Sequence, residues 1–250
     1  MLPLAVSGAP LENIVSRRSS VLRTRLCGLY VGVDGCKQGW VAVSVTMEGF
    51  SVARVFADFD RLLAAFAGVK TIGVDIPIGL LASEPRVADE AARKFLPGNA
   101  SSVFPAPVRP ALEARSHDEA NRISKKVSGK GLSAQTYNLF VKIREVDAHA
   151  KDTRIHEVHP EVSFRTMGEG RPLQSKKTWG GMKGRLALLA REGIVLPDEL
   201  GDVDAVGIDD VIDAAGAAWS ARRVGQGIAR RFGDARQLDP RHGRIVAIWA

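Results

Sequence analysis

The stretch that decides the fold runs from Tyr30 to Val45 and reads YVGVDGCKQGWVAVSV. Two runs of alternating, β-branched residues flank a turn rich in glycine and polar residues, which is the pattern of a β-hairpin. A third alternating run, FSVARVF from Phe50 to Phe56, predicts another antiparallel strand. Asp58 then stands at the expected N-cap of a helix that reaches Ala67. These residues predict three antiparallel strands followed by a helix.

A fourth strand is predicted in TIGVDIPIGL, from Thr71 to Leu80. The run is short and almost entirely apolar, as in a strand that helices cover on both faces. We expect Pro77 to end it, because proline has no N–H for a central ladder. Three antiparallel strands, a helix and a buried strand give the order βββαβ. That order predicts an α/β protein of RNase H-like fold, with a mixed five-stranded sheet flanked by helices.

The rest of the chain is expected to complete a single domain over residues 29–250. Residues 82–150 are polar, interrupted by prolines and mostly helical in pattern, which predicts a helical insertion over the functional edge of the sheet. Its last part, from Lys130 to His149, reads as one amphipathic helix. The remaining predicted elements are a last strand from Arg154 to Phe164, a helix from Gly184 to Arg191, a final helix from Asp209 to Arg231 and a short strand from Arg244 to Trp249.

Composition narrows the class of protein. The chain has 250 residues and a formal net charge of +7, and the first 28 residues contribute four arginines against one glutamate. We expect those 28 residues to be a disordered extension, because a signal peptide would place its positive charge before an apolar run. The rest is mildly basic, which favours nucleic acid or a nucleotide as partner. No run approaches the roughly 20 apolar residues of a membrane span, and two cysteines suit a cytoplasmic protein with reduced thiols.

Two aspartates stand inside predicted buried strands. Asp34 lies two residues after Gly32 in the first strand, and Asp75 lies two residues after Gly73 in the fourth. A buried carboxylate is costly unless it is paired, hydrogen-bonded or bound to a cation. One such residue could simply cap a turn or accept backbone N–H bonds. Two of them, each beside a glycine at the end of a central strand, favour a shared site.

The final predicted helix supplies further acids, in the segment IDDVIDAAGAAW. Asp210 and Asp213 are three residues apart and therefore lie on one helical face. Acids in a first turn are also explained by capping and by the helix macrodipole, which accounts for Asp209 and can account for Asp210. Asp213 lies one turn deeper, among small residues that predict close packing on the sheet. We therefore expect Asp213 to meet the strand aspartates.

Carboxylates that converge from two strands and a helix would repel one another unless a cation lay between them. Hard oxygen ligands suit Mg²⁺ or Mn²⁺ rather than zinc. We predict that Asp34, Asp75 and Asp213 bind the metal and that Asp210 joins them in the catalytic group. Two such ions about 3.5–4 Å apart would hydrolyse a phosphodiester bond, one activating water and the other stabilising the leaving oxygen.

The segment from Glu157 to Glu161 gives two more catalytic candidates. In a strand, Glu157, His159 and Glu161 would point to the same face, although Pro160 indicates a strand end or edge. A histidine flanked by carboxylates could be a general base, a metal ligand or a hydrogen-bonded core residue. We predict catalytic roles for His159 and Glu157 ahead of Glu161.

Four basic side chains are candidates for substrate contact. Lys37 lies in the first hairpin, Arg144 in a predicted helix, and Lys176 and Lys177 in a basic loop. Each could contact phosphate, or could simply be a solvated surface charge. On the final predicted helix four arginines would fall on nearly one face, because seven or eight residues make about two turns: Arg222, Arg223, Arg230 and Arg231.

Taken in order, these motifs resemble a prokaryotic family labelled domain of unknown function 429, or predicted RNase H-like nuclease. The resemblance runs from about Val31 to Ala221, over DGCKQGWVAV, VDIPIGL, SSVFPAPVR, GKGLSAQ, KIREVD, EVHPEVSF, SKKT and DDVIDAAGAAW. More distantly, the last helix is similar to the Asp-x-x-Asp-Ala pattern of Holliday-junction resolvases. The resemblance implies a nuclease whose acidic cluster is Asp34, Asp75, Asp210 and Asp213.

The sequence departs from ribonuclease H proper, which has a glutamate in its first helix. The corresponding helix here has only Asp58 and Asp60, both at its start. The resemblance therefore implies a site of the resolvase type, with an acid on the fourth strand.

Three functions compete. The first is a metal-dependent nuclease or related phosphodiester hydrolase. The second is a nucleotide-binding phosphotransferase of the actin and sugar-kinase kind, which shares the βββαβ core but normally needs two such cores. The third is a non-catalytic nucleic-acid-binding protein, which has no reason to bury several carboxylates facing one another. The acidic cluster therefore favours the metal-dependent hydrolase.

Overall fold

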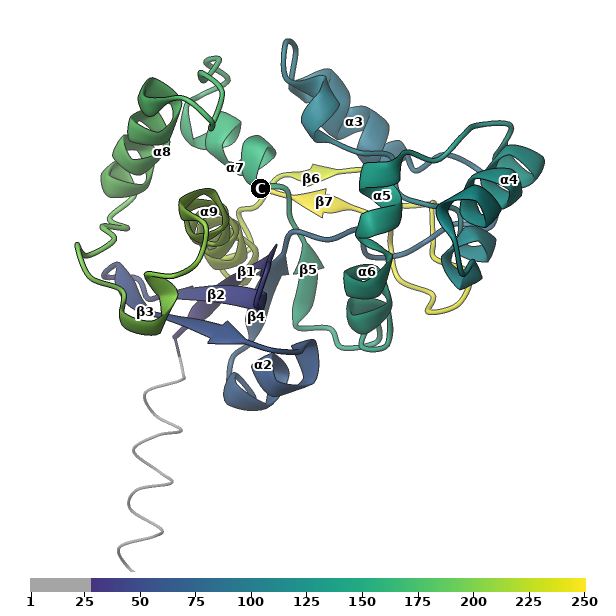
Figure 1. Cartoon of the computed structure of the whole chain (residues 1–250). Helices are drawn as coiled ribbons and strands as arrows, with labels where there is room; N and C mark the ends of the chain where they lie inside the picture. The colour runs from purple at the N-terminus through teal and green to yellow at the C-terminus, as the bar shows by residue number, and fades with distance from the viewer. Residues whose placement is uncertain (1–27) are drawn as a thin grey trace, which may run out of the picture.

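The computed structural model describes residues 28–250, and Figure 1 shows how its elements are arranged. The disordered extension predicted for residues 1–28 therefore lies, except for Gly28, outside the described residues and stays a prediction. In the described part of the chain, no helix is long and apolar enough to cross a membrane.

A mixed five-stranded sheet forms the centre of the protein. Its strands are β1 (Tyr30–Cys36), β2 (Gly39–Val45), β3 (Phe50–Phe56), β4 (Thr71–Val74) and β5 (Ile155–Glu157), in the order β3-β2-β1-β4-β5. Strand β2 is antiparallel to both β1 and β3, whereas β4 is parallel to β1 and β5 is parallel to β4. The predicted α/β class and the mixed five-stranded sheet are confirmed.

The β1–β2 hairpin and helix α2 form where the sequence predicts them. Gly39 closes the hairpin with a φ of +124°, and a Cβ there would lie 2.3 Å from the carbonyl oxygen of Phe56. Helix α2 (Phe59–Ala65) begins after Asp58, whose Oδ1 accepts a hydrogen bond of 2.8 Å from the Arg61 N–H. The residue types at these two positions therefore follow from backbone geometry.

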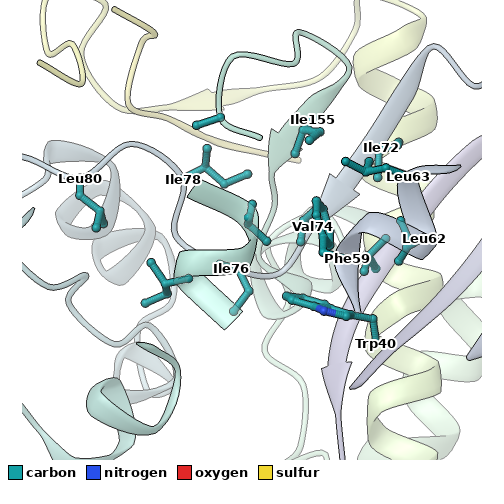
Figure 2. Close-up of a cluster of buried hydrophobic side chains, with 14 of the residues drawn as sticks. Trp40, Phe59, Leu62, Leu63, Ile72, Val74, Ile76, Ile78, Leu80 and Ile155 are labelled. Atoms are coloured by element: carbon teal, nitrogen blue, oxygen red, sulfur yellow. The ribbon is translucent and has the colours of Figure 1, made fainter. Parts of the chain in front are cut away.

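Strand β4 ends earlier than predicted, at Val74 rather than at Pro77. The Asp75 N–H still donates to the Val33 carbonyl at 2.9 Å, and the chain then leaves the sheet. Ile76, Ile78 and Leu80 remain buried beyond the strand, and Figure 2 shows them in one cluster with Trp40, Phe59 and the β4 residues. The apolar run therefore predicts burial correctly but overstates the strand.

Helix α9 (Ile208–Gly225) covers the face of the sheet opposite α2 (Figure 1). Every residue from Val211 to Arg222 is buried. The helix ends six residues before the predicted Arg231, which lies instead in β6 (Arg231–Phe232), paired with β7 (Ile248–Trp249). The expectation that four arginines share one face of this helix is therefore wrong, because the second pair lies beyond its end.

Residues 82–150 contribute no strand to the sheet and contain six helical segments. They comprise α3 (Val87–Phe95), η1 (Ala100–Ser102), η2 (Arg109–Glu113), α4 (His117–Ser128), α5 (Ala134–Asn138) and α6 (Phe140–Asp147). The single helix predicted from Lys130 to His149 is in fact two. Ser133 caps α5 by accepting a hydrogen bond from the Thr136 N–H, so the residues before it are not helical.

The strand predicted from Arg154 to Phe164 is present only as the three-residue β5, and α7 (Pro160–Met167) begins three residues after its end. The prediction is therefore wrong for residues 160–164, which are helical. His159 has the extended backbone of an N-cap, and Pro160 occupies the first helical turn, where the missing N–H has no cost. Helix α8 (Trp179–Arg191) starts five residues before the predicted Gly184, after a Thr178 cap, and η3 (Gly201–Val203) precedes α9.

Candidate functional site

Two neighbouring parallel strands bring Asp34 and Asp75 together. Val33 of β1 pairs with Val74 of β4, so the next residue on each strand lies at the same edge of the sheet. Both aspartates are only partly exposed and line one cavity of about 350 Å³. Asp34 Oδ1 accepts a hydrogen bond of 2.7 Å from the Gly35 N–H. The predicted meeting of the two strand aspartates is therefore present.

Glycines bring α9 close enough for Asp213 to join them. A Cβ at Gly32 would lie 1.9 Å from the Ala218 nitrogen and 2.1 Å from the Ala214 oxygen. A Cβ at Gly73 would lie 2.8 Å from the Ala217 oxygen. The backbone of α9 thus rests directly on β1 and β4. Asp213, on the same helix, is buried, and its Oδ1 atom has no hydrogen-bond partner.

The three carboxyl groups share one electrostatic environment. Burial, followed by the charges of Asp75, Asp213 and Asp210, raises the pKa of Asp34 well above its usual value. Burial and the charge of Asp213 raise the pKa of Asp75 to about 8. Burial also raises the pKa of Asp213, although Lys176 opposes this change. Mutual repulsion of this kind is typical of functional carboxylates.

Lys176 supplies the positive charge inside this group. Its Nζ lies 2.5 Å from Asp213 Oδ2 and 3.8 Å from Asp209 Oδ2. Burial lowers the pKa of Lys176, but the charge and hydrogen bond of Asp213 outweigh that effect and the pKa is raised. Lys176 therefore stays an ammonium ion, and it lines the same cavity as Asp34 and Asp75.

Asp210 lies at the margin of the cluster rather than in the cavity. Its charge raises the pKa of Asp34, while its own pKa is raised by burial and by Asp209. Neither Asp210 nor Asp213 lines the cavity that holds Asp34 and Asp75, but Asp213 is paired with Lys176, which does line it. The helical spacing thus predicts correctly that Asp210 and Asp213 share a neighbourhood, but only Asp213 is deeply buried.

The predicted catalytic segment enters the cavity in a different geometry. His159 and Glu161 both line it, but Glu161 lies in the first turn of α7 and accepts hydrogen bonds of 2.6 and 2.7 Å from buried Arg185. Glu157 also lines it, yet its Oε2 accepts from Arg86 Nη2 at 2.5 Å and from the Ile78 N–H at 2.6 Å. The prediction that the three residues share one strand face is wrong, because the strand ends before His159.

His159 keeps one ring nitrogen available. Its Nε2 lies 3.2 Å from the Ser102 carbonyl oxygen, so this nitrogen carries the proton and donates. Its Nδ1 therefore bears a lone pair, and that buried atom has no hydrogen-bond partner. Burial lowers the pKa of His159. The ring is consequently a neutral base at physiological pH.

The predicted basic contacts divide into two groups. Lys176 lies in the site, while Lys177 is exposed and its Nζ lies 3.7 Å from Asp209 Oδ2. Lys37 is exposed in the β1–β2 turn and is not among the residues that line the cavity. Arg144 does not face the site: its guanidinium donates to the carbonyl oxygens of Leu112 and Ala114. These hydrogen bonds hold the insertion together, and the phosphate contact predicted for Arg144 stays a prediction.

Lys142 is the basic residue that the sequence analysis missed. It lines the cavity, and its Nζ donates to the Gly39 carbonyl and lies 4.4 Å from the centre of the Trp40 ring. The sequence contained a signal that could have identified Lys142. Lys142 and Arg144 are two positions apart in one helix, which corresponds to a rotation of about 200° around the helix axis. If Lys142 faces the sheet, Arg144 must face away.

The family of this chain is shown by its sequence. A family described as "Protein of unknown function (DUF429)" matches residues 32–237. The chain belongs to the DUF429 family. No curated protein and no solved structure matches it. The DUF429 match includes every aspartate of the cluster from Asp34 to Asp213, so these residues belong to the family domain.

The donor chemistry of the DUF429 site fits Mg²⁺ or Mn²⁺. Three carboxylates from different elements supply hard oxygens, and Asp213 Oδ1 is buried without a partner. In this structure the ligand atoms of the three carboxylates do not all lie within 4.8 Å of one another. In the described part of the chain, a different set of three groups meets that criterion. Asp213 is also held by Lys176. Metal binding at this site would therefore require Lys176 to release Asp213 and the carboxylates to move closer together.

That other set consists of Asp147, Asp239 and His242. Arg109 lies between its two acids, with Nη1 2.9 Å from Asp147 Oδ2 and Nη2 3.0 Å from Asp239 Oδ2. Arg241 adds a second contact of 3.3 Å to Asp147. Two guanidinium groups neutralise two carboxylates. The cluster is therefore an ion-pair network that fixes the C-terminal segment, and its chemistry does not fit a metal.

Proposed function

We propose that this protein is a metal-dependent hydrolase of phosphodiester bonds, with an RNase H-like fold and nucleic acid as its substrate. The observation that carries the proposal is the convergence of Asp34, Asp75 and Asp213 with raised pKa values. Burying like charges is costly, so a cluster of this kind is maintained where a cation is to be bound. We propose Mg²⁺ or Mn²⁺ as that cation.

The sheet supports the fold assignment. Three antiparallel strands are followed by α2 and by a strand parallel to β1, and α9 covers the opposite face. This is the strand order expected from βββαβ, and the described residues contain one such core. A phosphotransferase of the actin kind would need a second. A non-catalytic binding protein would gain nothing from the buried acids.

The side chains at the site have the following roles under this proposal. Asp34, Asp75 and Asp213 hold the metal, and Asp210 adds negative charge at its margin. The metal, when bound, supplies an activated water and stabilises charge on the leaving oxygen. His159 Nδ1 accepts a proton from the attacking water, because it is a neutral base with a free lone pair. Lys142 and Lys176 attract the substrate phosphate.

The test is hydrolysis of a panel of fluorescent DNA and RNA substrates by the purified full chain. We expect cleavage with Mg²⁺ or Mn²⁺, none with chelator, and a loss of at least 100-fold in Asp34→Asn. Asp198→Asn, which changes an exposed carboxylate, is the matched control and should retain full activity. Cleavage that persists in chelator, or is equal in both variants, would overturn the proposal.

A further inference from the structure

A second cavity lies beside the carboxylate cavity and is formed entirely by the helical insertion. It has a volume of about 420 Å³ and is lined by α3, α4, α5 and the loops Pro105–Val108 and Lys130–Ser133. Both cavities fall within the size range of small-molecule sites, roughly 300–1,000 Å³. Three residues line both of them: Asp89, Pro105 and Thr136. The two spaces therefore share a wall.

The shared wall contains a buried ion pair. Glu157 faces the carboxylate cavity and Arg86 faces the second one, and they are joined by the 2.5 Å contact between Nη2 and Oε2. The Arg86 side chain is 2% exposed; its Nε lies 3.6 Å from Asp89 Oδ1, beyond hydrogen-bond distance, and its Nε and Nη1 atoms have no hydrogen-bond partner. A buried guanidinium with unused donors is costly. An acceptor placed at this wall would satisfy it.

The lining of the second cavity selects a neutral, flat and partly apolar occupant. Three acids and three basic residues line it, so its formal charge is zero: Glu84, Asp89, Glu90, Arg86, Arg93 and Lys130. Three prolines and Leu132 give apolar walls, and Ser124, Ser128 and Thr136 give hydroxyl groups. An anion would gain little here. A nucleobase presents an apolar face and a hydrogen-bonding edge, and it matches these walls.

We infer that the second cavity binds the base of an unpaired nucleotide whose phosphate lies at the Asp34–Asp75–Asp213 site. The inference rests on the proposed function and narrows its substrate. A base inside a duplex is paired and stacked, so it cannot reach the walls of this cavity unless it is extruded. The ligand is thus a single nucleotide unit, either free or in a single strand, and intact duplex is excluded.

The test compares variants that fill the cavity with a bulky residue. Ser128→Trp on α4 and Glu90→Trp on α3 fill it from opposite walls, while Asp118→Trp places the same residue at a fully exposed position of α4. Binding of nucleosides, which carry no phosphate, is measured by NMR in chelator. Binding of mononucleotides, of single-stranded oligonucleotides and of the same oligonucleotides as duplex is measured with Mn²⁺.

We expect nucleosides to bind the native chain and Asp118→Trp equally, and each filled variant at least tenfold more weakly. Comparing the binding of mononucleotides with that of single-stranded oligonucleotides shows whether the base belongs to a free nucleotide or to a single strand. Duplex should bind at least tenfold more weakly than single strand. Thermal unfolding confirms that at least one filled variant is folded. Equal nucleoside binding in the filled variants, no nucleoside binding at all, or equal binding of duplex and single strand would overturn the inference.

The two proposals fail separately. If Ser128→Trp abolishes nucleoside binding and the native chain shows no metal-dependent cleavage, the hydrolase proposal is overturned and the base-binding inference is supported. Metal-dependent cleavage that is unchanged in Ser128→Trp would keep the hydrolase and remove the base site.

Discussion

Lys176 Nζ lies 2.5 Å from Asp213 Oδ2, so an ammonium ion of the protein itself occupies part of the carboxylate cluster. Under the proposed function this ion pair would weaken metal binding, because a divalent ion at Asp213 would have to compete with a positive charge that is already there.

Removing that competitor should strengthen metal binding. In Lys176→Met we expect Mn²⁺ to bind about tenfold more tightly by calorimetry, equivalent to about 1.4 kcal/mol. The melting temperature should fall in chelator, because the carboxylates lose their counterion, and should recover with Mn²⁺. Lys177→Met changes a side chain that is 79% exposed and should show neither effect. Weaker metal binding in Lys176→Met would contradict this account.

The close contact between α9 and the sheet should not tolerate a side chain. Gly32→Ala would place a methyl group 1.9 Å from backbone atoms of α9, so we expect a loss of more than about 4 kcal/mol or failure to fold. Gly184→Ala in α8 is the control. Its added Cβ meets nothing closer than 3.6 Å and should stabilise the helix by about 0.5–1 kcal/mol. Urea unfolding measures both, and a mild effect of Gly32→Ala would mean that the contact is looser.

The C-terminal ion-pair network should act in stability and not in metal binding. Asp239 is 0% exposed and contacts Arg109, so Asp239→Asn leaves a buried charge poorly paired and should cost about 3–5 kcal/mol. Asp234→Asn breaks the surface pair with Arg236, whose side chain is 90% exposed, and should cost less than about 1 kcal/mol. If zinc raised the melting temperature of the native chain but not of Asp239→Asn, the network would be a metal site after all.

His156 should make the protein less stable in acid. Burial, and then the charge of Arg244, lowers its pKa to about 4 from the usual 6.5. Between these values the unfolded chain binds more protons, so the free energy of unfolding decreases as the pH falls from 6.5 to 4. The contribution is at most about 3 kcal/mol. His156→Gln should flatten this part of the pH profile of the free energy of unfolding; a profile that keeps the same slope in His156→Gln would contradict the prediction.

Helical phase should separate two neighbouring basic residues of α6. Lys142→Met removes a charge from the cavity and a hydrogen bond to the Gly39 carbonyl, so we expect an increase of about tenfold in KM for the cleavage substrate and a loss of about 1 kcal/mol in stability. Arg144→Met removes hydrogen bonds to Leu112 and Ala114 and should cost about 1–3 kcal/mol without changing KM. The reverse pattern would show that Arg144 contacts the substrate.

The sequence by itself determined the early strands, α2 and the identity of the acids that meet. Alternation, the Asp58 cap and the buried run around Asp75 are local signals, since each follows from the geometry of one segment. The proximity of Asp34 and Asp75 could be predicted from the sequence, because neighbouring parallel strands end at the same edge of a sheet. Gly32, Gly73 and the small residues of α9 indicated the close packing that carries Asp213 to them.

Only the tertiary structure decided where the charged side chains find partners. Glu157 and Arg86 are 71 positions apart in the chain, and Lys176 and Asp213 are 37 apart, so no local pattern links either pair. Pro160 fits both a strand end and a first helical turn, and the capping backbone of His159 selected the helix. The partner of a charged side chain is decided by which groups lie within a few ångströms of it in space. Spacing along the chain predicts those neighbours only within one helix or one strand.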